Sequence, residues 1–297
     1  MQGIKVFLIR RCSVIMLLIL SLFITSCAPR AIQPSKPAKI AVVLGAGASR
    51  GFAHIGVLKV LESNKIPVHM IVGTSAGSFV GSLYAYGYNA FQVQELSFSL
   101  ERSDIIDFGI PDKGFVKGDA LEEFINEKTK NTLIENLKIP FYAVATDILS
   151  GEETIFSSGN TGTAVRASCS IPGVFRPVKI GDRLYADGGI VSPVAVDAAK
   201  KLGADIVIAV DISYDVDNTR PEGTIDMILK AVTIMHSKIA SIQLARADVV
   251  IRPKVGYIGS SDFTKRHEAV LEGEKAATEA LPEIQKIIDR LRQEGRL

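Results

Sequence analysis

Short apolar runs alternate with helical patterns of apolar residues along the chain from residue 39 onward. Continuous runs of branched apolar residues at 40–44 and 205–212 predict buried parallel strands. Further strands are expected at 69–73, 141–149, 153–158, 183–186 and 247–253. Helices are predicted at 51–64, 75–87, 90–101, 118–129 and 223–246, and from residue 263 to the end.

Strands that alternate with helices predict an α/β fold. The expected architecture is a three-layer α/β/α sandwich around a mainly parallel sheet. The chain shows neither an internal repeat nor a second apolar core. We therefore expect one catalytic domain over residues 39–258, followed by a helical C-terminal extension over 259–297.

The first 26 residues have the pattern of a signal peptide. Lys5, Arg10 and Arg11 precede an apolar run of 11 residues at 14–24, whereas a membrane-spanning helix needs about 20. The run ends in Ile-Thr-Ser before Cys27, which resembles the bacterial lipobox, where the cysteine receives a diacylglyceryl group. The alternative is an ordinary cleaved signal followed by a chance cysteine.

Residues 27–38 then read as a lipidated tether, since residues 28–38 hold three prolines and no periodic apolar pattern. This predicts a membrane-anchored lipoprotein of the bacterial cell envelope. Ala28 is not the aspartate that signals inner-membrane retention in enterobacterial lipoproteins, so the outer membrane, facing the periplasm, is expected. Membrane lipids would then be both anchor and substrate, and protein partners stay unknown.

Composition narrows the possible functions. Apolar residues make up 47% of the chain and charged residues 22%, as in a folded protein. The net charge is only +2, and the lysines and arginines form no basic stripe, so no nucleic-acid partner is expected. Cys12, Cys27 and Cys169 fit neither a disulfide framework nor a metal cluster. We therefore expect no metal and no cofactor.

The strongest chemical signal is the sequence Gly-Thr-Ser-Ala-Gly at 73–77. It follows a predicted strand and opens a predicted helix, which is the context that a nucleophile elbow requires. The sharp turn needs residues that are nearly free of side chains two positions before and after the serine, and Gly73 and Gly77 meet that need. The pattern predicts Ser75 as a nucleophile.

A glycine-rich loop at 45–51 follows the first strand and can bring backbone N–H groups together at a helix start. Two interpretations compete. A dinucleotide-binding loop would need an acidic residue about 20 positions later, and the stretch at 66–77 contains none. An oxyanion hole beside Ser75 is therefore favoured.

A base for Ser75 is harder to find. None of the four histidines stands in a late loop, where a Ser–Asp–His order would place it. For His54, on the helix after the glycine loop, packing or capping is the expected role. Asp187 comes before Gly188 and Gly189 at the end of a short strand, so a carboxylate is the better candidate.

Four motifs together carry a specific resemblance. A glycine loop that ends in Arg50-Gly51 and continues as Ala-His-Ile-Gly-Val-Leu is followed by Gly-Thr-Ser-Ala-Gly, by Arg-Ala-Ser-Cys-Ser-Ile-Pro-Gly-Val-Phe-Arg-Pro-Val at 166–178, and by Asp-Gly-Gly. In this order, over residues 40–196, they resemble the patatin-like phospholipase family, here in a bacterial, lipoprotein-type form.

The resemblance implies a Ser75–Asp187 catalytic dyad with an oxyanion hole from the N–H groups of Gly47 and Ala48. The residues expected to support these motifs are Gly45, Arg50, Gly51, Gly73, Gly77, Gly188 and Gly189. The chain departs from the family pattern at three points, because Ala46 and Ala48 replace common glycines and Ser192 replaces an asparagine before proline.

These residues predict a serine acyl hydrolase that cleaves lipid or phospholipid carboxylic esters through an acyl-enzyme. A thioesterase or acyltransferase with the same dyad is the alternative within enzymes. A lipoprotein that binds acyl chains without catalysis is the alternative outside them.

Overall fold

A sheet of eight strands organises residues 37–297, which form one unit of the computed structural model. Residues 36–110, 112–213 and 220–297 are described; the predicted signal peptide, Cys27 and most of the tether lie outside them. The strands are β1 (Ile40–Leu44), β2 (Met70–Thr74), β4 (Phe141–Asp147), β5 (Glu153–Phe156), β7 (Val178–Ile180), β8 (Arg183–Asp187), β9 (Ile206–Val210) and β10 (Val249–Ile251).

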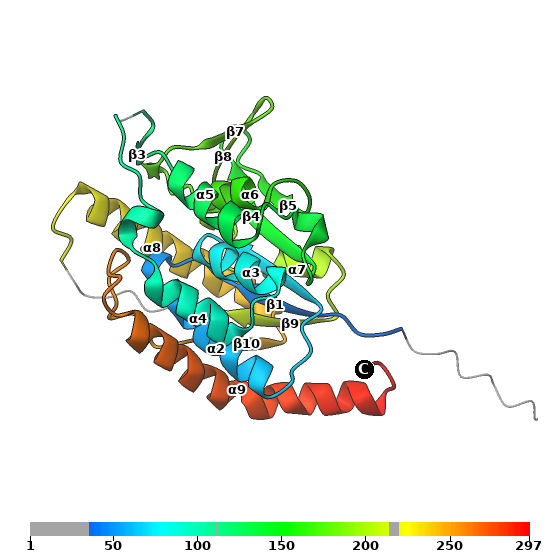
Figure 1. The fold of residues 1–297 in the computed structure, drawn as a ribbon. Coiled ribbons are helices and arrows are strands. Elements are labelled where there is room, and N and C mark those ends of the chain that lie inside the picture. The colour runs from blue at the N-terminus through cyan, green and yellow to red at the C-terminus, as the bar shows by residue number, and fades with distance from the viewer. Residues whose placement is uncertain (1–35, 111, 214–219) are drawn as a thin grey trace, which may run out of the picture. The chain divides into compact units, whose positions relative to one another are not determined.

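The strand order is β10-β9-β1-β2-β4-β8-β7, with β5 also paired to β4. The five strands from β10 to β4 are parallel, and β5, β7 and β8 join them in antiparallel pairs. The predicted mainly parallel sheet is thus confirmed (Figure 1). A separate parallel pair is formed by β3 (Gly114–Val116) and β6 (Gly173–Phe175).

Both faces of the sheet are covered, as its apolar strands require. Residues 40, 42 and 44 of β1 belong to one apolar cluster, and residues 41 and 43 belong to another. The first face is packed by α2 (Phe52–Ser63), α3 (Ala76–Tyr86), α4 (Ala90–Ser99) and α9 (Arg266–Gln293). The second face is packed by α7 (Val196–Lys201) and the end of α8 (Thr224–Gln243). This is the predicted three-layer arrangement.

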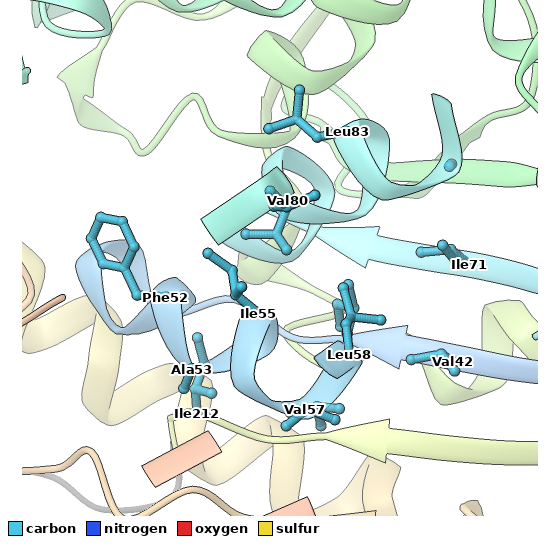
Figure 2. Packing of buried hydrophobic residues seen from close by; sticks show 14 of the residues in the cluster. Val42, Phe52, Ala53, Ile55, Val57, Leu58, Ile71, Val80, Leu83 and Ile212 are labelled. Carbon is cyan, nitrogen blue, oxygen red and sulfur yellow. The ribbon is translucent and has the colours of Figure 1, made fainter. Parts of the chain in front are cut away.

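Figure 2 shows how the first face is filled. Leu58 of α2 lies beside Val42 of β1 and Ile71 of β2, while Val80 of α3 lies close to Ile55. Each of these side chains is almost completely buried. Burying an aliphatic side chain contributes roughly 1.5–3 kcal/mol, so this layer fixes α2 and α3 firmly over the parallel strands.

The C-terminal helix α9 crosses α2 at unusually short range. A Cβ added to Gly56 would lie 2.0 Å from the carbonyl oxygen of Val270, and one added to Gly273 would lie 2.0 Å from that of Ala53. Only glycines permit such an approach between two helix backbones. The helical C-terminal part that the sequence predicts is therefore a packed layer of the same compact unit.

Several short elements had no signal in the sequence pattern. They are β3, β6, β7, α6 (Thr161–Ser168) and α7, whereas α5 (Asp119–Lys128) confirms the helix predicted at 118–129. Strands of three residues show too few positions for an alternation, and α6 is rich in Thr, Ser and Gly, which are weak helix formers. Within the described residues, no helix combines the length and apolar character needed to cross a membrane.

The contact between α2 and α9 generates a prediction. We expect Gly56→Ala to lower the free energy of unfolding by at least about 2 kcal/mol, because the new methyl group overlaps backbone that cannot move aside. Urea unfolding followed by circular dichroism measures this. Gly223→Ala is the control, since no atom lies within 4 Å of an added Cβ there; equal losses in both variants would contradict the close crossing.

Candidate active site

Ser75 lies on a sharp turn between β2 and α3. Its backbone has φ 53° and ψ −122°, a conformation that residues with side chains rarely adopt. The N–H groups of Ser78 and Phe79 donate to the Ser75 carbonyl oxygen and close the first turn of α3. The strand–turn–helix context expected for a nucleophile elbow is present.

Gly73 and Gly77 flank this turn where no side chain fits. A Cβ on Gly77 would lie 2.0 Å from the carbonyl oxygen of Leu44, at the end of β1. A Cβ on Gly73 would lie 2.5 Å from Ser78 Cα. Both glycines are therefore required by close backbone approach, as the sequence analysis argued from the shape of the turn.

Asp187, the last residue of β8, accepts a hydrogen bond from Ser75. The distance from Ser75 Oγ to Asp187 Oδ2 is 2.6 Å, and the other carboxyl oxygen accepts the N–H of Gly189 at 2.7 Å. Only 1% of Asp187 and 4% of Ser75 are exposed. The structure thus brings together the two residues that the sequence proposed as nucleophile and base, although they lie 112 positions apart.

Burial raises the pKa of Asp187 from 3.8 to about 7, and the hydrogen bonds from Ser75 and Gly189 oppose that rise in part. A carboxyl group with a pKa near 7 is a better proton acceptor than an ordinary one, because its basicity is closer to that of the proton donor. Burial therefore gives the Asp187 carboxyl group a basicity close to that of an ordinary histidine.

Two further hydroxyl groups hold the pair in place. Ser168 Oγ accepts the N–H of Ser75 (2.9 Å) and donates to the carbonyl oxygen of Val144 (2.6 Å). Thr146 Oγ1 donates to the carbonyl oxygen of Asp187. The sequence around Ser168 predicts no such role for this hydroxyl group, which only the three-dimensional contact reveals.

The glycine loop between β1 and the short helix η1 (Ala48–Gly51) has amides of two kinds. The N–H groups of residues 45, 46, 49 and 50 each donate to a backbone carbonyl. For the N–H groups of Gly47 and Ala48, the described part of the chain provides no hydrogen-bond partner. These are the two amides predicted to form the oxyanion hole. Ala48 lines the same cavity as Ser75, and the role of the two amides stays a prediction.

Ala48 has φ 50°, in the left-handed region that favours glycine. Glycine is common in the family at this position because the backbone there is left-handed, and alanine adopts that conformation only with strain.

Arg50 and His54 hold the loop from two sides. Arg50 Nε donates to the carbonyl oxygen of Ile258 (2.8 Å), and His54 Nε2 lies 2.8 Å from the carbonyl oxygen of Gly45. Burial lowers the pKa of His54 to about 4, so its ring is neutral and donates.

The Asp-Gly-Gly turn is also built on close contacts. A Cβ on Gly188 would lie 2.2 Å from the carbonyl oxygen of Val144, and one on Gly189 would lie 2.2 Å from His236 Nε2. Ser192, which replaces the usual asparagine, donates its N–H to the carbonyl oxygen of Gly188 at 2.8 Å, and its hydroxyl group accepts from Gln243 Nε2 at 3.2 Å. The turn is supported despite that substitution.

A cavity of about 160 Å³ opens above Ser75. Its walls come from α3, α4, the segment before α5, the segment between α6 and β6, and the first half of α8. The side chains are mainly apolar; they include Phe52, Phe79, Ile171, Phe175, Leu229 and Phe263. A mainly apolar chamber whose lining includes Ser75 suits a hydrocarbon chain whose carbonyl group meets that serine.

Other candidate groups do not enter this site. Among the described residues, no cluster of three or more histidine, cysteine or acidic side chains could hold a metal ion. Asp147 accepts the N–H of Leu149, and Asp211 accepts from Ser213, so both carboxylates serve their own turns. Within the described structure, no hydrogen bond joins a histidine ring to Ser75 or Asp187.

Fold and site place the chain among α/β proteins whose serine stands on a nucleophile elbow. The particular family follows from comparison: the family model described as patatin-like phospholipase matches residues 42–200. That is more than half of the chain, and the chain belongs to the patatin-like phospholipase family.

Individual relatives agree with this assignment. Lysophospholipase NTE1 of Coccidioides immitis is 31% identical over 87% of this chain, and an uncharacterised NTE family protein of Mycobacterium bovis is 35% identical over 61%. The matches span 18% and 51% of those relatives' own lengths. The crystal structure of VipD from Legionella pneumophila has the same fold, with a TM-score of 0.56 at 14% identity over 84% of this chain and 67% of VipD.

The raised pKa of Asp187 makes a prediction about stability. Since the folded protein holds the proton more tightly than the unfolded chain does, this residue stabilises the fold fully below about pH 4, and that contribution is lost as the pH rises through 7. Asp187→Asn should therefore be more stable than the wild type at pH 8, by up to about 4 kcal/mol, and equal to it at pH 4.

Urea unfolding at the two pH values measures the difference. Asp289→Asn, on an exposed part of α9, is the matched control and should change the free energy of unfolding by less than about 0.5 kcal/mol at either pH. If Asp187→Asn is less stable than the wild type at pH 8, the ionised carboxylate of Asp187 does not destabilise the folded protein, and the prediction is wrong.

Proposed function

We propose that this protein is a serine acyl hydrolase that cleaves carboxylic esters of membrane lipids. The observation that carries the proposal is the 2.6 Å hydrogen bond from Ser75 Oγ to the buried carboxyl group of Asp187, beside an apolar cavity. Membership of the patatin-like phospholipase family and the name of the fungal relative, a lysophospholipase, support a lipid substrate.

In the proposed mechanism, Asp187 accepts the proton of the Ser75 hydroxyl group while the serine oxygen attacks the ester carbonyl carbon. The N–H groups of Gly47 and Ala48 stabilise the oxyanion, and one such donor typically contributes about 3 kcal/mol. The alcohol leaves with the proton that Asp187 held. Water then attacks the carbonyl carbon of the acyl-enzyme while Asp187 takes its proton. The bond to Ser75 Oγ breaks, Ser75 receives that proton, and the fatty acid leaves.

The cavity supports acyl-chain recognition more than head-group recognition. Its lining is mainly apolar, and its polar lining residues include Ser97, Arg102, Ser260 and Ser261. An acyl chain can occupy the apolar walls while the glycerol side of the ester faces outward. We therefore expect selection by chain length to be stronger than selection by head group.

The test is hydrolysis of a panel of p-nitrophenyl esters, acyl thioesters and phospholipids by the wild type and Ser75→Ala. We expect the variant to lose at least about a thousandfold in turnover while its circular dichroism spectrum is unchanged. Ser82→Ala, a buried serine on the same helix, is the control. A fluorophosphonate probe should label only proteins with Ser75, and near-wild-type turnover in Ser75→Ala would move the search to another nucleophile.

We propose further that the chain is a lipoprotein anchored through Cys27. The support is the basic start, the short apolar run and the proline-bearing tether, all read from the sequence. Cells expressing the wild type or Cys27→Ala are grown with radiolabelled fatty acid and fractionated. Wild type should carry label and sediment with membranes, and Cys27→Ala should do neither; an unlabelled wild type would leave an ordinary exported enzyme.

A further inference from the structure

A β-hairpin formed by residues 107–110 and 112–117 projects from the domain (Figure 1, next to the label β3). Two of its residues, Phe108 and Val116, line the cavity. The N–H of Lys117 donates to the carbonyl oxygen of Asp107 at 2.9 Å, and the N–H of Gly109 donates to that of Phe115 at 3.0 Å. Phe108 and Val116 face each other across the pair. On its other side the second arm, β3, pairs with β6.

The hairpin exposes large apolar side chains on both of its faces. Phe108 is 61% exposed, Ile110 85% and Phe115 38%. Side chains alternate between faces along a strand, so Phe115 points away from the side on which its buried neighbour Val116 lines the cavity. A hairpin that only covered the cavity would need apolar residues on its inner face alone.

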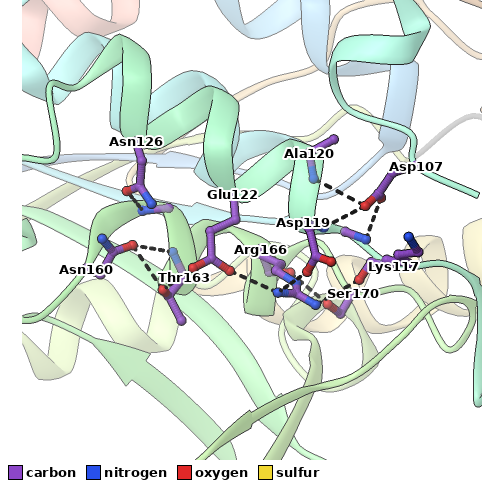
Figure 3. Close-up of polar contacts among 12 residues, drawn as sticks. Asp107, Lys117, Asp119, Ala120, Glu122, Asn126, Asn160, Thr163, Arg166 and Ser170 are labelled. Atoms are coloured by element: carbon purple, nitrogen blue, oxygen red, sulfur yellow. Dashed lines mark hydrogen bonds and ion pairs between the residues drawn. The ribbon is translucent and has the colours of Figure 1, made fainter.

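A polar network at the base of the hairpin fixes it to the domain (Figure 3). The Asp107 carboxylate accepts the N–H groups of Gly118, Asp119 and Ala120 at the start of α5. Arg166 donates to the carbonyl oxygen of Lys117 and to Glu122. The exposed apolar residues therefore extend from a base that is fixed to the domain, and ordering them costs little additional entropy.

Charge near the tip suits a surface that bears phosphates. Lys113 is exposed, Lys117 is half-buried beside Gly109, and Arg176 Nη2 donates to the carbonyl oxygen of Ile110 at 2.6 Å. Of the two carboxylates in the hairpin, that of Asp107 is occupied by three backbone N–H groups, and Asp112 stands at the tip. Two lysines of the hairpin and Arg176 thus stand against two carboxylates, one of which is already occupied by backbone N–H groups.

We infer that this hairpin inserts into the surface of a phospholipid bilayer, so that the cavity mouth opens toward the lipids. Phe108 continues the apolar lining of the cavity out to the tip, which gives an acyl chain a dry route from the bilayer to Ser75. The inference rests on the proposed function, since a lipid ester is a substrate that must be drawn from a bilayer or another lipid aggregate.

The chain contains no tryptophan, so a single introduced tryptophan reports its own surroundings. Full-length Ile110→Trp is compared with Ile242→Trp, whose position near the end of α8 is 75% exposed and lies about 20 Å along the helix from the cavity residue Leu229. A lipid anchor at the N-terminus would be the same in both variants, so it cannot cause a difference between them. With phosphatidylcholine–phosphatidylglycerol vesicles, Ile110→Trp should shift to shorter wavelength and be quenched by brominated acyl chains, and Ile242→Trp should not.

A second measurement separates docking from catalysis. Ile110→Ser should lower hydrolysis of vesicle phospholipid on the order of tenfold, as expected for the loss of one buried isoleucine, and leave hydrolysis of soluble p-nitrophenyl butyrate unchanged. Ile242→Ser should change neither. If no variant cleaves any ester but Ile110→Trp is still quenched, docking stands and the proposed function fails.

Two results would overturn the inference. One is equal quenching, or no quenching, at positions 110 and 242. The other is a fluorescence shift of Ile110→Trp that depends on protein concentration without vesicles, because the hairpin would then contact a second copy of the chain.

Discussion

The burial of Asp187 is the constraint on which the rest of the site depends. Within the described residues the carboxyl group has no cationic partner, and its hydrogen bonds come from the hydroxyl group of Ser75 and the N–H of Gly189. A buried carboxylate held this way is costly, which is why burial raises its pKa toward 7. Its basicity and its cost to stability have the same origin.

Holding Ser75 against this carboxyl group requires backbones to approach each other where side chains would normally keep them apart. The glycines at 73, 77 and 188 allow it, since an added Cβ at each position would lie within about 2.5 Å of neighbouring backbone atoms. The turn at Ser75 is also strained. The apolar layers on both faces of the sheet supply stability that offsets these costs.

The pattern of apolar residues was sufficient to predict the helices that are long and the strands that are uniformly apolar. The strand at 40–44 was predicted with its observed bounds, and the strand–turn–helix around Ser75 followed from the glycine spacing. The pairing of Ser75 with Asp187 came from the family resemblance and from the lack of a suitable histidine. Nothing in the local sequence could reveal the contact of Ser168 with Ser75, or that the C-terminal helix is part of the core, because both depend on residues far apart in the chain.

The apolar walls of the cavity have two consequences under the proposed mechanism. They bind the acyl chain, and they exclude water from the carboxyl group that acts as base. A substrate whose chain fills the cavity removes remaining water beside Ser75, which makes the hydrogen bond to Asp187 stronger in the low-dielectric surroundings. Chain binding and base strength are then coupled, so a short acyl chain loses rate as well as affinity. This coupling gives a dyad without histidine a reason to prefer lipid esters over small soluble ones.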